Sequence, residues 1–228
     1  GGTVYDSHFI GNTCWGYGGG VASSTLHRCI IEGSLTTHEA AGAYGCTLID
    51  CRLHHNRTPA YAGGASQCVL ERCIVADNVA EGAGGIAEST ANACAIYRNV
   101  GGGASQCSLD HCIVAWNEGG GCRWGTCSNS IVWNNIAETN ANVYSVDCSY
   151  TCTTPLPTGP GNIDVDPGLA SFTHIQIDSP CIGAGIASGS AGDVDGESWA
   201  ASPAIGCDEV VVGAVTGPIS LLIVSSTL

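Results

Sequence analysis

Residues 46–56 read CTLIDCRLHHN, and residues 68–78 read CVLERCIVADN. Both segments carry Cys at the first and sixth positions, Leu at the third and Asn at the last. Related segments occupy residues 4–12, 24–34, 91–99, 107–117 and 127–135. The chain is therefore built from an internal repeat, and repeats of about 20 residues are typical of a solenoid.

The repeat length changes along the chain, and two columns of residues change together. The central column is Ser7, Cys29, Cys51, Cys73, Cys94, Cys112 and Ser130, with steps of 22, 22, 22, 21, 18 and 18 residues. A glycine column follows the same steps at Gly20, Gly42, Gly64, Gly85, Gly103 and Gly121. Because independent columns share one changing period, the repeat is structural.

The residue types favour strands over helices. Two positions after the centre stand Phe9, Ile31, Leu53, Val75, Ile96, Val114 and Val132, an apolar and mostly β-branched column that predicts an inward-facing strand position. A polar column occupies the position five residues after the centre: Asn12, Ser34, Asn56, Asn78, Asn99, Asn117 and Asn135. An Asn at this corner can adopt a left-handed turn, and stacked amides can bond from rung to rung as a ladder. The glycine column predicts a second corner with positive φ or close packing.

Short strands in rungs of 18 to 22 residues, with Asn ladders and inward aliphatic or Cys stacks, resemble the right-handed parallel β-helix family. This family includes pectate-lyase-like folds and many bacterial surface and secreted proteins. The resemblance implies an all-β, single-stranded right-handed parallel β-helix of about seven to eight regular rungs. We expect regular rungs over residues 3–148, irregular C-terminal rungs over 149–209, and an apolar β-prone tail over 210–228.

The C-terminal part resembles a group of surface β-helix proteins that end in an ordered run of short motifs. The matching residues are 161–163 (GNI), 165–167 (VDP), 178–185 (DSPCIGAG), 193–196 (DVDG) and 204–209 (AIGCDE). Gly183 departs from the group, which usually carries Asp at that position. The resemblance implies a secreted or surface-displayed protein, and most members of the group have no assigned activity.

Composition excludes several classes of partner. The net charge is −14, Lys is absent and the six cationic side chains are all Arg, so no basic patch exists that could neutralise nucleic acid or an anionic membrane. No stretch reaches the length of an apolar membrane helix, and the closest, residues 210–228, is interrupted by Gly and Pro. The absence of Met and the Gly-Gly start suit a mature, processed protein.

The fifteen Cys residues predict an oxidising, extracellular location with disulfides, and their odd number leaves at least one thiol free or paired between chains. Cys29, Cys51, Cys73, Cys94 and Cys112 form a core stack. Such a stack can pack as small apolar side chains or form disulfides between neighbouring rungs. Zinc binding by this stack is not expected, because ligands one rung apart form a line rather than a tetrahedron.

Catalytic residues are harder to find in this sequence. A polyuronate lyase needs cationic groups, which are scarce here, and the nearby acids Asp50, Glu71, Asp77 and Asp110 are too dispersed for a polygalacturonase-like pair. Asp6, Arg28, Asp50 and Arg72 alternate in charge one position before the centre, which predicts a solvated ladder of ion pairs. His54 and His55 are adjacent on a strand and are expected to face opposite ways, so they should not chelate together.

Two further groups are candidate binding sites. Tyr97, Trp116 and Trp133 lie on successive rungs near the Asn corner and could stack on sugar rings, contact a subunit or pack at the corner. Asp164, Asp166, Asp193 and Asp195 resemble an oxygen-rich Ca²⁺ loop, with turn formation as the alternative. We expect no other cofactor.

The sequence thus predicts a non-enzymatic extracellular structural protein, either a self-assembling filament subunit or a surface adhesin. The first rung has no polar segment to cover it, and the tail is apolar, so we expect head-to-tail homopolymers. Polysaccharide is the other expected partner. The alternatives are a carbohydrate-active enzyme, a lyase or hydrolase, on the same scaffold, and a passive fragment of a larger surface protein.

Overall fold

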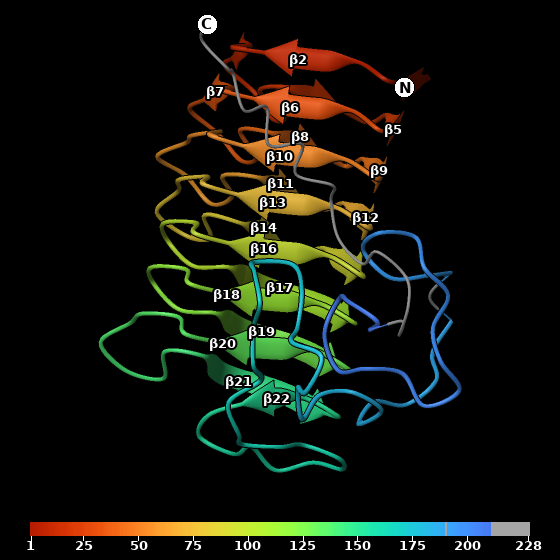
Figure 1. Cartoon of the computed structure of the whole chain (residues 1–228). Helices are drawn as coiled ribbons and strands as arrows, with labels where there is room; N and C mark the ends of the chain where they lie inside the picture. The colour runs from red at the N-terminus through yellow and green to blue at the C-terminus, as the bar shows by residue number, and fades with distance from the viewer. Residues whose placement is uncertain (190, 211–228) are drawn as a thin grey trace, which may run out of the picture.

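The computed structural model of the chain describes residues 1–189 and 191–210. Within this part the chain is all-β, and its parallel strands stack into a β-solenoid of about seven turns (Figure 1). No helix in these residues is long and apolar enough to span a membrane. The predicted assembly tail lies outside the described residues, apart from Val210.

One face of the solenoid is an eight-stranded parallel sheet with one strand from each rung. Its members are β2 (His8–Ile10), β6 (Ile30–Glu32), β10 (Arg52–His54), β13 (Ile74–Ala76), β16 (Ala95–Tyr97), β18 (Ile113–Ala115), β20 (Ile131–Trp133) and β22 (Cys152–Thr153). Leu53 of β10 pairs with Ile31 of the preceding rung and with Val75 of the following rung, as the repeat period predicts.

The other faces form a twelve-stranded sheet and a two-stranded one. The larger sheet contains β1 (Thr3–Tyr5), β4 (Val21–Ala22), β5 (Thr25–His27), β8 (Ala43–Tyr44), β9 (Thr47–Ile49), β11 (Ala65–Ser66), β12 (Val69–Glu71), β14 (Ile86–Ala87), β15 (Thr90–Asn92), β17 (Ala104–Asp110), β19 (Cys122–Ser128) and β21 (Val143–Ser149). The smaller sheet pairs β3 (Thr13–Cys14) with β7 (Leu35–Thr36). Both contain only parallel pairs, so the fold is a parallel β-helix.

The corners of each rung are made by residues in the left-handed region. In the third rung these are Gly45, Asp50 and His55, with φ of 60°, 55° and 57°. The Asn that follows the last of these corners is not among the residues with positive φ, so the predicted left-handed Asn is wrong by one position. The glycine column also has no positive φ, but close packing requires it. A Cβ on Gly64 would lie 2.6 Å from both the Gly85 oxygen and Val75 Cγ1.

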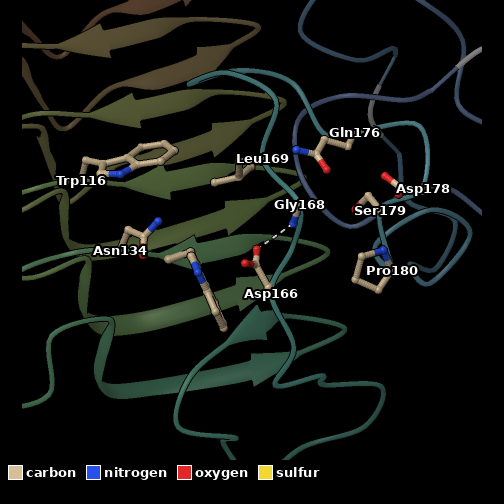
Figure 2. A pocket seen from close by; sticks show the side chains of 10 residues that line it. Trp116, Asn134, Asp166, Gly168, Leu169, Gln176, Asp178, Ser179 and Pro180 are labelled. Carbon is tan, nitrogen blue, oxygen red and sulfur yellow. Dashed lines mark hydrogen bonds between the residues drawn. The ribbon is translucent and has the colours of Figure 1, made fainter.

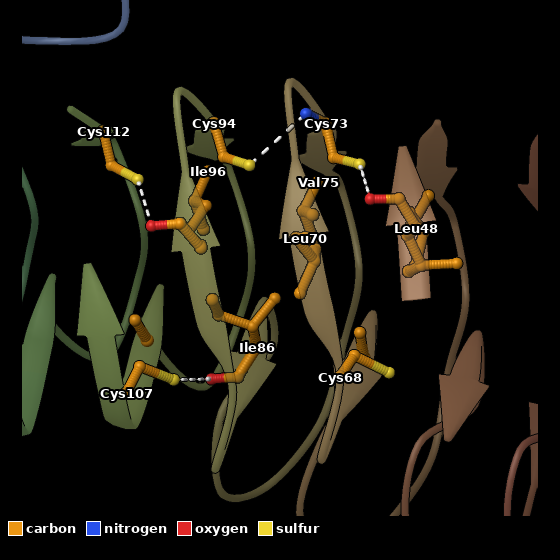
Figure 3. Close-up of a cluster of buried hydrophobic side chains, with 14 of the residues drawn as sticks. Leu48, Cys68, Leu70, Cys73, Val75, Ile86, Cys94, Ile96, Cys107 and Cys112 are labelled. Carbon is orange, nitrogen blue, oxygen red and sulfur yellow. Dashed lines mark hydrogen bonds between the residues drawn. The ribbon is translucent and has the colours of Figure 1, made fainter. Parts of the chain in front are cut away.

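The interior is a column of aliphatic and sulfur side chains (Figure 3). Leu48, Leu70, Val75 and Ile96 are fully buried. The Cys stack lies beside them, and each sulfur contacts backbone groups of the adjacent rungs. Cys73 Sγ, for example, lies 3.3 Å from the Leu48 oxygen.

All fifteen Cys residues are free thiols, so the expected disulfides are not present. Many of the sulfurs instead hydrogen-bond to backbone groups near the corners. Cys94 Sγ accepts the Cys73 backbone N–H at 3.3 Å, and the Ser130 hydroxyl accepts the Cys112 N–H in the same way at 2.9 Å. A Cys at this corner therefore acts both as a small core side chain and as a backbone partner.

The Asn column forms a continuous buried ladder. The side-chain amide of each Asn donates to the Oδ1 of the next, from Asn56 through Asn78, Asn99, Asn117 and Asn135 to Asn142, at 2.9 to 3.1 Å. Asn142 extends the ladder beyond the residues that the repeat identified. Asn12 is exposed and lies outside the ladder, and Ser34 of the following rung joins it only through its backbone N–H, which donates to Asn56 Oδ1 at 3.0 Å.

Candidate functional site

The C-terminal segment, residues 154–210, leaves the last rung and runs back over the outer face of the eight-stranded sheet (Figure 1). Apolar outward residues of the late rungs lie under it. Ile113 and Ile131 are fully buried there, together with Ile205 of the segment. Gly206 donates its backbone N–H to the Asn129 oxygen at 2.8 Å. This segment therefore belongs to the same body as the rungs.

The sequence carries a signal for this packing. The outward column one position after the centre reads His8, Ile30, Arg52, Ile74, Ala95, Ile113, Ile131 and Cys152. It changes from mixed to wholly apolar at Ile74. An outward strand position that is apolar over five successive rungs indicates a covered surface.

A groove opens between the late rungs and this segment (Figure 2). It encloses about 430 Å³ and is lined on the solenoid side by Trp116, Trp133 and Asn134. The opposite side is formed by Asp166, Gly168, Leu169, Gln176, Asp178, Ser179 and Pro180. Two half-buried indoles thus share a groove with carboxylate, amide and hydroxyl groups.

Corner geometry positions the groove residues. Trp116 and Asn134 have φ of 53° and 55°, so the left-handed corner turns their side chains away from the core. On the other side, the Asp166 carboxylate accepts the Gly168 N–H at 2.9 Å, and the Ser179 hydroxyl donates to the Pro167 oxygen at 2.6 Å. These bonds hold the segment wall in a defined shape.

The structure separates the three predicted aromatic residues. Tyr97 does not line the groove, because it stacks on Phe172 with ring centroids 4.5 Å apart. Phe172 also contacts the Trp116 ring edge-on at 5.0 Å. Trp116 and Trp133 remain as groove residues, and Tyr97 anchors the C-terminal segment.

The four aspartates proposed as a Ca²⁺ loop are not brought together. Asp166 lines the groove, and Asp164 is exposed elsewhere on the segment. Asp193 is fully buried, and its two oxygens accept backbone N–H groups of Asp195, Glu197 and Glu209 at 2.7 to 3.1 Å. Asp193 therefore organises the turn, and its burial raises the pKa of the carboxyl group.

Asp195 instead lies beside His174 and Asp208, which the sequence analysis did not select. His174 Nε2 is 2.7 Å from Asp195 Oδ2. Burial raises the pKa of Asp208 to about 6. Asp195 and Asp208 stand in the motifs DVDG and AIGCDE, whereas His174 lies outside every quoted motif, and the three residues meet only through the path of the C-terminal segment.

The prediction that His54 and His55 face opposite ways is wrong. Their Nδ1 atoms lie 2.8 Å apart, and Glu32 of the neighbouring rung completes a potential ligand group. His55 has a φ of 57°, which breaks the alternation of a strand. The two rings therefore end on the same side.

The acids nearest the sheets are already paired. Arg28 binds Asp6 through two hydrogen bonds of 2.7 and 2.8 Å. Arg72 similarly binds Asp50 at 2.7 and 3.2 Å, and it also contacts Glu71. The remaining pairings are Asp77 with Arg98, and Asp110 with Ser128 and Asn129. These carboxylates serve as partners within the scaffold.

Comparison with known proteins supports the fold. No protein-family model matches the chain, and no curated protein matches it in sequence. Among solved structures, pectate lyase Pel9A matches with a TM-score of 0.53 at 12% identity over 91% of this chain. The match spans 65% of that lyase's chain. At this identity the likeness shows a shared parallel β-helix and does not transfer an activity.

Proposed function

We propose that this protein is a non-enzymatic extracellular protein that binds neutral polysaccharide through the groove between Trp116 and Trp133. The observation that carries the proposal is this pair of half-buried indoles facing the polar wall of Asp166, Gln176 and Asp178. Indole faces stack on the apolar face of a sugar ring, and carboxylates and amides accept or donate to its hydroxyls. Of the two structural roles that the sequence predicts, a filament subunit and a surface adhesin, the groove favours the adhesin.

Charge supports a neutral ligand. The groove contributes two carboxylates and no cationic side chain among its lining residues. The whole chain carries a net charge of −14. An acidic polymer such as a polyuronate would be repelled from this surface, whereas a neutral glycan would not.

The non-enzymatic part of the proposal rests on the paired acids. A glycosidase needs two carboxyl groups free to exchange protons across the scissile bond. On the sheet faces, Asp50, Asp77 and Asp110 are bound to neighbouring side chains, as described above. The groove itself holds Asp166 and Asp178, which are the pair that a hydrolase would use. The rival assignment is a lyase or hydrolase on the same scaffold.

Binding is tested by titrating the protein with soluble neutral glucans, mannans and galactans, with polygalacturonate as the acidic comparison. Trp133→Ala should weaken binding at least tenfold, the loss of about 1.4 kcal/mol that one stacked ring supplies. Trp15→Ala is the matched control, because Trp15 is 83% exposed and lies outside the groove. Equal affinity of the Trp133 variant and the parent, or binding to none of the neutral glycans, would overturn the groove assignment. Steady release of reducing or unsaturated ends would instead establish the enzyme.

We also propose that copies of the protein associate head to tail, as the sequence predicts. Strands β1 and β2 each lie at an end of their sheets, and Val4 and Phe9 in this rung are only half-buried. Such an end offers strand edges and apolar contacts to a second copy. Light scattering over a wide concentration range tests this, and a constant monomer mass would contradict it.

A further inference from the structure

Three side chains from separate parts of the C-terminal segment converge beside the eight-stranded sheet. They are His174, Asp195 and Asp208, and one ligand atom from each lies within 4.8 Å of the others. His174 Nε2 is 2.7 Å from Asp195 Oδ2 and 3.9 Å from Asp208 Oδ1. Among the described residues, only Glu32, His54 and His55 form a comparable group.

The Asp208 carboxylate is incompletely satisfied. The residue is 1% exposed, and its Oδ2 accepts the Ile175 N–H at 2.9 Å. Its Oδ1 is buried and has no hydrogen-bond partner among the described residues. A buried, unpaired carboxylate oxygen is costly, so its position facing His174 calls for a bound cation.

The imidazole of His174 is oriented in the way that metal-bound histidines are. Its Nδ1 lies 2.6 Å from Thr173 Oγ1 and 3.1 Å from Ser171 Oγ. Without a metal ion, Nε2 donates its proton to Asp195 Oδ2 at 2.7 Å, and a bound cation would replace that proton while Nδ1–H donates to the hydroxyls. The His174 side chain is 11% exposed, which limits its motion.

We propose that His174, Asp195 and Asp208 form a binding site for a divalent transition-metal cation such as Zn²⁺. One imidazole nitrogen with two carboxylate oxygens suits Zn²⁺, whereas Ca²⁺ prefers six or more oxygen ligands. Asp195 is the exposed member, so a fourth ligand position faces solvent and would hold water. Asp193 does not join the site, because backbone amides occupy both of its oxygens.

Such a site would lock the C-terminal segment in place. His174 precedes Ile175, which packs against the late rungs, and Asp208 follows the buried Ile205 and Cys207. A cation bridging these positions would hold three passes of the segment together. We therefore expect the metal to stabilise the folded protein as well as bind to it.

The test uses full-length protein without a histidine tag, dialysed against chelator. The reference protein for this test, called the parent below, is a triple variant with His54→Ala, His55→Ala and Cys14→Ser. These changes remove the other candidate ligand pair and the least buried thiol. Calorimetric titration should show one equivalent of Zn²⁺ and no comparable Ca²⁺ binding. Saturating Zn²⁺, at about 100 times Kd, should raise Tm by about 5 to 10 °C.

Asp208→Asn and His174→Gln are the test variants, and Asp164→Asn is the control for an exposed carboxylate outside the site. Asp208→Asn keeps its shape and retains an oxygen for the Ile175 N–H. Both test variants should bind Zn²⁺ at least 100-fold more weakly, with far-UV circular dichroism unchanged, while Asp164→Asn should bind like the parent. In the parent, Co²⁺ should give a visible absorption spectrum without a thiolate charge-transfer band.

Two binding results and one spectroscopic result would overturn the proposal. One is parent protein that binds no Zn²⁺ by calorimetry. The other is an Asp208→Asn variant with the affinity and Tm shift of the parent. A Co²⁺ spectrum with a thiolate band would also reject it, because it would place the metal on cysteine.

Discussion

The Asn ladder makes a quantitative prediction for Asn78→Leu. The Asn78 side chain is fully buried and makes four side-chain hydrogen bonds. Its Oδ1 accepts from the backbone and side chain of Asn56 at 2.9 and 3.0 Å. Its Nδ2 donates to the Leu53 oxygen at 3.0 Å and to Asn99 Oδ1 at 3.1 Å. Leucine has a similar size but can make none of these bonds.

At about 1 kcal/mol net per hydrogen bond, the loss amounts to about 4 kcal/mol. The more apolar Leu side chain returns part of this by burial, about 1 kcal/mol. The free energy of unfolding should therefore fall by about 3 kcal/mol. Urea unfolding followed by far-UV circular dichroism measures it.

Asn12→Leu is the matched control, because it makes the same chemical change in the same column at an exposed position. It should alter the free energy of unfolding by less than about 0.5 kcal/mol. If the two variants differ by less than about 1 kcal/mol, the ladder does not contribute as the hydrogen-bond geometry requires.

Three further outcomes are expected. Gly64→Ala should destabilise the fold by about 3 kcal/mol, because the new Cβ would lie 2.6 Å from the Gly85 oxygen. Gly2→Ala is the control and should leave the stability unchanged, because no atom lies within 4 Å of its Cβ position. Equal urea unfolding midpoints for the two variants would refute this. A thiol reagent should modify only Cys14 quickly in the native state and all fifteen thiols after unfolding; a lower final count would reveal disulfides. Arg28→Ala should leave the urea midpoint unchanged, because Arg28 and its partner are 55% and 63% exposed; a clear shift would show that the surface pair matters.

The β-helix was predictable because its information is periodic. Leu48 and Leu70 recur at the repeat length, and the structure pairs them directly in β9 and β12. A parallel stack places every residue beside its equivalent one rung away, so a column in sequence becomes a column in space. The same logic located the Asn column, although the left-handed residue proved to be its predecessor.

The C-terminal segment follows no such rule. It has no repeat, and its residues meet through a path that local sequence does not encode. Asp193 and Asp195 are two positions apart, yet one is fully buried by backbone amides and the other lies in a cluster with His174. Aspartates that look alike in sequence therefore have different roles.

The solenoid, its core columns and the chemical character of its corners follow from the sequence, because each depends on equivalent residues one repeat apart. The three-dimensional path of the chain fixes which outward residues are covered, that Tyr97 is packed while Trp116 lines a groove, and that His174 meets Asp208. The physical reason is that these contacts form between a non-repeating segment and a distant face of the sheet. Their geometry depends on how the apolar surface around Ile113 and Ile131 is buried, and no short-range pattern records that choice.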